Sequence, residues 1–346
     1  MSFRTWISVI TVILIALLIY FARDELVHAW HLLGQANLLI LLLLIPLQMI
    51  IYYSVGEMGF SYLRAKQSIS HIKPLSLIRL SLEMNFVNHV MPSGGISGVS
   101  YTSWRLSAYG VSPGRATMTQ AVRLSMGFVS YAFLLIIALL AITIEGKMNK
   151  STFTISGILL VILIVCLGSC IYLIKSAHRT DKFAKWSSMI INSIVKFITF
   201  GRVNQLVDKK KASNLLNTMH IDYIELQNEK KVLLKPFLWG VLMNIGEVSM
   251  YIVTFWALGE FIDPALVLVA FGVATVASII SVTPGGAGLY EAIMVGIMTL
   301  SGTSASIAIA GIVLTRVTIL MTTVILGYIF YQHSIIKHGK SKKSHI

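Results

Sequence analysis

The sequence predicts an all-α, polytopic membrane protein that forms one integral membrane domain, residues 1–346. Hydrophobic residues make up 56% of the chain and charged residues only 12%, and the mean hydropathy is +0.79. A soluble protein of 346 residues could not cover its surface with so few charges. Several apolar stretches also approach the roughly 20 residues that a helix needs to cross a bilayer.

Six stretches are expected to be full membrane spans. The first, Ile7–Ala22, resembles a signal peptide, but Arg23-Asp24-Glu25 follows it in place of a small-residue cleavage site, so we interpret it as an uncleaved span. Cys166 and Cys170 share the fourth span and are expected to pack there without a disulfide or a metal. The other five spans are expected at Leu38–Val55, Ala116–Thr143, Phe153–Ile174, Phe237–Leu258 and Ser306–Tyr331.

The distribution of charge sets the expected orientation. The formal net charge is +14, and the basic residues cluster in a few loops beside apolar spans. This pattern fits cytoplasmic loops facing an anionic leaflet and argues against nucleic acid as a partner. We expect a multi-pass protein of the plasma (inner) membrane of a prokaryote, with both termini cytoplasmic. Six spans place every charged loop on the expected side of the membrane only if each of two further segments enters and leaves the membrane on the same side, or crosses it twice.

A basic connector, residues 175–235, separates a first half (1–174) from a second half (236–346). It contains twelve Lys/Arg and five Asp/Glu residues. Apolar side chains recur in it at helical spacing, which predicts an amphipathic helix on the membrane surface. Whether this helix only connects the halves or also contacts lipid stays open. The apolar positions are Phe183, Trp186, Ile190, Ile194 and Phe197.

Two segments are predicted to be broken, re-entrant hairpins. The first runs from about 75 to 109 and the second from about 264 to 300, and each is interrupted by proline and paired glycines, which do not fit a helix interior. Unwound backbone at membrane depth is tolerated where protein or a water-filled cavity satisfies it. Opposite orientation of the two would make an inverted repeat, as in many transporters. The alternative is a pair of ordinary loops between short spans. The breaking residues are Pro92, Gly94 and Gly95, and Pro284, Gly285, Gly286 and Gly288.

Ionisable residues inside apolar segments are candidate substrate-binding residues, because burying them in a bilayer costs free energy. We expect Arg123 and Arg316 to engage a lipid phosphate, and Glu291 to balance them or to bind a cationic headgroup. Glu83 and Glu247 are further candidates. In the alternative interpretation, these groups pair with one another and fix helix positions. Helix packing is the expected role of Asn85, Asn88 and His89.

The second break resembles a known motif. Pro284-Gly285-Gly286-Ala287-Gly288-Leu289-Tyr290-Glu291 is similar to the Pro-Gly-Gly-x-Gly-x-x-Glu signature of the lysylphosphatidylglycerol synthase transmembrane-region family, the flippase-like module of bacterial multiple peptide resistance factors. The run Asn85-Phe86-Val87-Asn88, with Met91-Pro92 and Gly94-Gly95, resembles the first motif of the family. Arg123 to Gly127 matches part of a later one, and Arg316 stands where the last-span arginine falls. The likeness covers essentially the whole chain in order.

Two departures from the family pattern stand out. Ile96-Ser97-Gly98 replaces an acidic residue followed by arginine, the nearest arginine being Arg105, and Val122 replaces a glutamate. These changes imply a different headgroup. The resemblance also implies that the aqueous aminoacyl-transferase domain of full-length resistance factors would be a separate lipid-modifying enzyme and thus a partner.

The leading functional hypothesis is a lipid translocase whose partners are membrane lipids. It would move a phospholipid or another anionic lipid, such as an aminoacylated or polyprenyl lipid, between the leaflets. The headgroup would be held at the midplane by half-helix ends and by intramembrane arginine and glutamate residues. No glycine-rich Gly-x-x-x-x-Gly-Lys loop is present, so ATP is not expected to be the direct energy source. We expect no cofactor and no metal. A membrane enzyme acting on a lipid, and an accessory subunit of a lipid- or envelope-glycan-synthesis system, remain alternatives. Homo-oligomerisation stays open.

Overall fold

The computed structural model describes residues 36–90, 96–144, 150–198, 209–278 and 286–338, with the isolated positions 20, 27 and 34. Within these residues every regular element is a helix, so the all-α prediction is confirmed. The elements are α3 (Leu38–Leu41), α4 (Leu44–Ala65), α5 (Pro74–Val90), α6 (Ile96–Ser107), α7 (Pro113–Ile144), α8 (Lys150–Ile174), α9 (Ala177–Ile198), α10 (Lys209–Asn228), the 3-10 helix η1 (Lys230–Leu233), α11 (Leu234–Ala257), α12 (Pro264–Ser278), α13 (Leu289–Leu300) and α14 (Ala305–His338).

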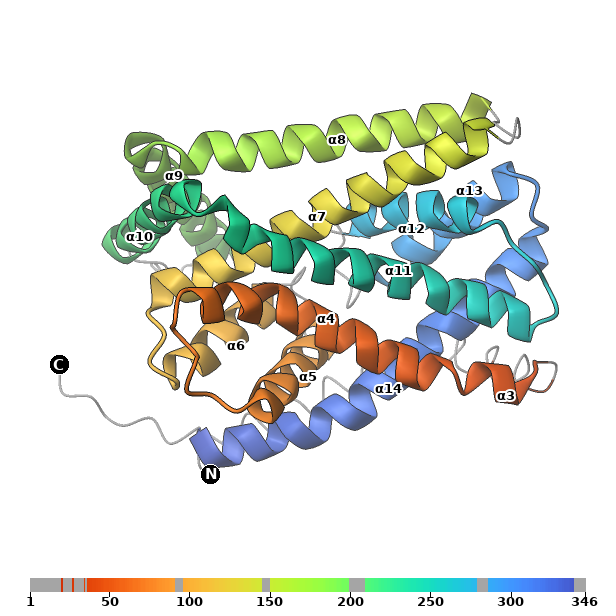
Figure 1. Cartoon of the computed structure of the whole chain (residues 1–346), viewed down its shortest axis with the longest axis horizontal. Coiled ribbons are helices and arrows are strands. Elements are labelled where there is room, and N and C mark those ends of the chain that lie inside the picture. The colour runs from red at the N-terminus through yellow and green to blue at the C-terminus, as the bar shows by residue number, and fades with distance from the viewer. Residues whose placement is uncertain are drawn as a thin grey trace.

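Five helical stretches are long and apolar enough to cross a membrane, and the long helices run roughly along the long axis of the molecule (Figure 1). They coincide with five of the six expected spans, whereas Ile7–Ala22 lies outside the described residues. α4 continues to Ala65 instead of ending at Val55, and Arg64 in its last turn pairs with Glu57 of the same helix. The stretches are Leu38–Ala65, Pro113–Ala141, Phe153–Ile174, Lys230–Ala257 and Ala305–Ile336.

Local sequence explains where several helices begin. α5, α7 and α12 each start with proline, whose fixed φ and missing N–H suit the first turn of a helix. The Asp263 carboxylate accepts a hydrogen bond of 2.8 Å from the Ala265 N–H at the start of α12, and Asn37 caps α3 in the same way.

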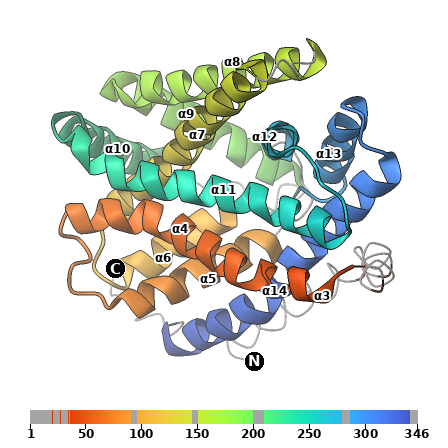
Figure 2. The same ribbon diagram turned by 45° about the vertical axis from the view of Figure 1, so that its right-hand side comes forward.

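The lipid-facing side of the bundle is clearest on α8, which lies at its edge in Figures 1 and 2. Large apolar side chains are exposed along this helix, an arrangement that suits hydrocarbon and would be unfavourable in water. They include Ile158, Val161, Ile164, Val165 and Ile171. The free cysteines Cys166 and Cys170 are exposed on the same helix.

Both expected breaks fall between a pair of short helices in contact with each other, α5 with α6 and α12 with α13. α5 and α6 lie toward the end of the bundle that carries α9 and α10, whereas α12 and α13 lie toward the opposite end (Figure 1). The breaking residues Pro92, Gly94, Gly95, Pro284 and Gly285 lie outside the described residues.

The apolar core is divided into three clusters. One, around Leu80 and Phe86, joins the ends of α4 and α14 to α5, α6 and α7. A second, around Phe255, joins α7 and α8 to α11, α12, α13 and α14. The third, around Ile51, joins α3, α4 and α5 to α11 and α14. Each broken pair is thus packed into a cluster with long helices, which positions the ends of its helices.

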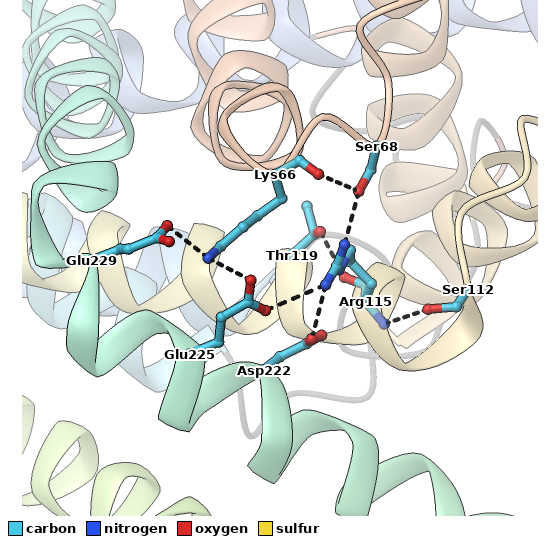
Figure 3. Close-up of polar contacts among 8 residues, drawn as sticks. All are labelled: Lys66, Ser68, Ser112, Arg115, Thr119, Asp222, Glu225 and Glu229. Carbon is cyan, nitrogen blue, oxygen red and sulfur yellow. Dashed lines mark hydrogen bonds and ion pairs between the residues drawn. The ribbon is translucent and has the colours of Figure 1, made fainter.

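The connector folds into α9 and α10, which pack on each other. The expected helix over Phe183 to Phe197 corresponds to α9. An ionic cluster holds the end of α10 to the bundle (Figure 3). In it, Arg115 of α7 lies 3.4 Å from carboxylate oxygens of both Asp222 and Glu225, and Lys66 lies 3.0 Å from Glu225 and 2.8 Å from Glu229. We had not predicted this docking, because its charges are far apart in the sequence.

Candidate functional site

A cavity of about 200 Å³ lies between α4, α5, α11, α12, α13 and α14. α5 is the first helix of one broken pair, and α12 and α13 form the other, so helices of both pairs border one space. A water molecule needs roughly 10–15 Å³ of such space, so the cavity is large enough for a polar group well above the size of one water molecule. Its lining is Gln48, Ile51, Tyr52, Asn85, His89, Glu247, Tyr251, Phe271, Thr275, Ser278, Tyr290, Arg316 and Ile319.

Arg316 of α14 is the arginine of this cavity. Its Nε donates to Glu291 Oε1 at 2.7 Å, and its guanidinium lies over the Tyr290 ring, 4.5 Å from the centroid. Tyr251 donates in turn to the Tyr290 hydroxyl at 3.0 Å. An ion pair on one edge and an aromatic ring on one face fix the plane of the guanidinium. Glu291 stands behind Arg316 and does not itself line the cavity.

Some of the other polar groups of the lining lack protein partners among the described residues. In the part of the chain that the structure describes, the Glu247 carboxylate makes no ion pair, and Thr275 Oγ1 is buried without a hydrogen-bond partner. His89 Nδ1 bonds the Asn85 carbonyl at 2.9 Å. Buried polar groups are normally satisfied by protein or by water. The cavity is therefore suited to a polar ligand or to ordered water.

Hydrogen bonds between α4 and α14 close one side of the cavity. Gln48 Nε2 donates to the Tyr52 hydroxyl at 2.7 Å and to the Ile319 carbonyl at 3.0 Å. The Tyr52 hydroxyl also bonds Thr323. Interhelical bonds of this kind each contribute up to about 1–2 kcal/mol within a membrane, so this wall is held together by polar contacts as well as by packing.

Comparison of the sequence with known proteins assigns the chain to a family. The sequence model of the lysylphosphatidylglycerol synthase transmembrane region matches residues 6–327. The chain belongs to this family. It is also similar to a UPF0104 membrane protein of Methanothermobacter thermautotrophicus (strain Delta H), with 24% identity over 251 residues, 71% of this chain and 70% of the relative. No solved structure matches the chain. The resemblance found in the sequence is confirmed, and the protein is a multi-pass membrane protein of this family.

The signature at the second break has a local structural explanation. Gly286 and Gly288 adopt φ values of 75° and 87°, in the left-handed region that favours glycine. A Cβ on Gly286 would also come within 2.5 Å of the Ser278 Cβ. The Gly288 N–H donates to Glu291 Oε2 at 2.7 Å. The two glycines thus allow the chain to turn into α13, and Glu291 both caps this helix and orients Arg316.

The first family motif lies partly at the cavity. Asn85 and His89 line it, so our expectation of a packing role for them was incomplete. Asn88 does not line the cavity: its Oδ1 is buried without a partner among the described residues, and its side chain lies closely against Gly98 of α6.

Glu83 lies away from the cavity, in a buried network. Its Oε2 accepts hydrogen bonds from Tyr101 at 2.8 Å and from Arg105 Nε at 3.1 Å, and its Oε1 accepts one from Ser334 at 2.5 Å. The Glu83 and Arg105 side chains are only 2% and 4% exposed. In this pair, the alternative interpretation of the intramembrane charges fits the geometry: the ion pair joins α5 to α6.

Arg123 lies on α7 and does not line the cavity. Its Nε donates to Gln120 at 2.9 Å, and among the described residues it makes no ion pair. Farther along the same helix, Asn244 of α11 donates to Ser130 at 2.9 Å. The structure therefore brings Arg316, Glu291 and Glu247 to one site and leaves Arg123 and Glu83 elsewhere.

Sequence reasoning missed the uncharged part of the lining. Gln48, Tyr52 and Tyr251 lie in apolar helices, where an amide or hydroxyl resembles an ordinary packing residue. Tyr290 precedes Glu291 within the signature, and this position was the signal that could have found it. No group of His, Cys, Asp and Glu in the described residues could hold a metal ion.

Proposed function

We propose that the protein is a lipid translocase whose central cavity holds a phospholipid headgroup while the acyl chains stay in the surrounding lipid. The observation that carries this proposal is a polar cavity that is lined by helices of both broken pairs and by Arg316 and Glu247. Interrupted helices that meet at one polar site are a recurrent transporter plan. The family, named for the membrane region of a lipid synthase, supports a lipid-related role.

The charges of the site favour a headgroup that carries both a phosphate and a cation. Arg316 offers planar N–H donors suited to phosphate, and Glu291 balances its charge. Glu247 adds to the lining a carboxyl group that makes no ion pair among the described residues. The carboxyl ends of α5 and α12 also border the cavity, and helix carboxyl ends carry partial negative charge. In an amine-bearing phospholipid, the phosphate could contact Arg316 and the amine could contact Glu247.

Movement of the headgroup would require the cavity to open alternately to each leaflet. The broken pairs lie toward opposite ends of the bundle (Figure 1), which supports an inverted arrangement of two re-entrant hairpins. In our proposal the end carrying α10 and Lys66 faces the cytoplasm, as the excess of basic residues suggests. The cytoplasmic placement of both termini follows from the same argument.

The test is lipid movement in liposomes containing the purified protein. We would compare a zwitterionic aminophospholipid, an anionic phospholipid without an amine, and a polyprenyl phosphate, each carrying a reporter. Wild type is expected to move the aminophospholipid fastest. Arg316→Gln should slow it at least tenfold, since one hydrogen bond to a charged group contributes about 1.5–3 kcal/mol. Glu247→Gln should reduce the preference for the amine-bearing lipid.

The matched control is Arg79→Gln, which removes an exposed arginine of α5 that does not line the cavity. It should leave the rate unchanged. If folded wild type moves none of the three lipids, the translocase proposal is wrong, and an accessory role beside a separate lipid-modifying enzyme becomes the better explanation.

A further inference from the structure

A second hollow, of about 450 Å³, lies between the end of α4 and the start of α11. It is lined by Ser61, Arg64, Ala65, Lys231, Val232 and Lys235 and shares no lining residue with the central cavity. On α4, Ser61 lies nine positions after Tyr52, so the two sites are separated by roughly 14 Å of helix. The hollow is therefore a distinct site at the end of the bundle.

The charges around this hollow are strongly positive. Arg64 is paired with Glu57, whereas Lys231 and Lys235 are exposed and make no ion pair among the described residues. Lys235 is the second residue of α11, whose first turn contains no acidic residue, and Lys231 lies in the four-residue 3-10 helix η1 directly before it. The amino end of a helix carries partial positive charge, so lysines there are electrostatically unfavourable unless an anion lies nearby. The arrangement is suited to an anion.

An independent observation comes from Ser61. This residue is only 4% exposed and lines the hollow, yet its hydroxyl has no hydrogen-bond partner in the described part of the chain. A buried hydroxyl without a partner costs free energy that a ligand oxygen would recover. The unsatisfied donor and the two lysines thus border the same space.

The surface beside the hollow indicates that the anion belongs to a lipid. Lys231 and Lys235 stand on the same face of the helix as Leu238, Leu242 and Ile245, which follow at helical spacing. These three apolar side chains are exposed by 55%, 39% and 47%. A lipid whose phosphate occupied the hollow could therefore lay an acyl chain along α11. A soluble phosphate would gain nothing from this stripe.

We propose that the hollow bounded by Ser61, Arg64, Lys231 and Lys235 binds the phosphate of an anionic phospholipid from the leaflet at that end of the bundle. The bound lipid bridges α4 and α11, two helices that also line the central cavity. This site is separate from the cavity and does not depend on the cavity moving lipid.

The experiment measures lipid binding to the full chain in detergent, by native mass spectrometry and by thermal stabilisation. The probes are phosphatidylglycerol, phosphatidylcholine and inorganic phosphate. Phosphatidylglycerol should bind and stabilise wild type more than either of the others. The double variant Lys231→Gln/Lys235→Gln should weaken that binding roughly tenfold or more, since each basic residue near the surface contributes about 1 kcal/mol toward anionic lipid.

Two further variants make the result specific. Lys73→Gln/Lys175→Gln removes the same charge from exposed positions outside the hollow and outside α9, and should bind phosphatidylglycerol like wild type. Ser61→Leu fills the hollow while keeping every charge, so it should lose binding as well. Equal affinity in all variants would overturn the proposal. Lysine-dependent stabilisation by inorganic phosphate as strong as that by phosphatidylglycerol would overturn the assignment to a lipid.

Discussion

The buried pair of Glu83 and Arg105 gives a sharp prediction, because the sequence made Glu83 a candidate binding residue and the structure gives it a structural role. Arg105→Gln would leave the Glu83 carboxylate, 2% exposed, without its cation. Breaking a buried ion pair typically costs 3–5 kcal/mol. Tyr101 and Ser334 still donate to Glu83, so we expect the lower end, about 3 kcal/mol. The melting temperature of Arg105→Gln should therefore fall measurably below that of wild type.

The measurement is thermal unfolding of purified protein in detergent, followed by tryptophan fluorescence, for both single variants and the double variant Glu83→Gln/Arg105→Gln. The double variant should recover most of the loss, because no unpaired charge remains buried. Arg79→Gln is the exposed control. A melting temperature of Arg105→Gln close to wild type, or a double variant no more stable than the singles, would refute this reasoning. The double variant should also keep wild-type lipid movement per folded molecule.

Two further predictions concern the second break and the docked connector. Gly286→Ala should destabilise the protein more than Gly288→Ala, because both positions have positive φ but only Gly286 has a neighbour within 2.5 Å of the added Cβ; thermal unfolding would show equal shifts if this were wrong. Burial, opposed by Arg115, raises the pKa of Asp222. The folded state thus binds this proton more tightly, and the stability from protonation is lost as pH rises through the folded pKa. Asp222→Asn should therefore melt above wild type near neutral pH, with the difference vanishing toward roughly pH 4, whereas Arg115→Ala should melt lower; the opposite order would contradict the burial argument.

The membrane spans could be predicted from the sequence because apolar length and flanking charge are local properties. Helix ends were less predictable. α4 runs past Val55 to Ala65, where Arg64 pairs within the same helix with Glu57, and a polar residue alone does not reveal such a partner. The docking of α10 through Arg115 and Asp222 joins residues that no local pattern relates.

The charged residues of the candidate site could be picked out from the sequence. Arg316, Glu291 and Glu247 stand out in apolar segments, and the structure gathers them at one place. Arg123 and Glu83 stand out equally, yet they lie elsewhere. Which charged side chains face a cavity depends on the rotation of each helix and on its partners across the bundle. Neither can be predicted from the sequence of one helix. Hydroxyl and amide groups such as that of Thr275 gave no signal.

The most direct test of the central claim is to block the cavity in a protein that otherwise works. In a variant with Cys166 and Cys170 replaced by alanine, Thr275→Cys places one thiol in the cavity lining. Lipid movement in liposomes is measured before and after reaction with a bulky thiol reagent, with the extent of labelling determined by mass spectrometry. Our account predicts wild-type movement before labelling and loss of movement after it, while the same reagent leaves the cysteine-free parent unaffected. Undiminished movement in fully labelled protein would contradict the account, because the lipid headgroup would then not pass through this cavity.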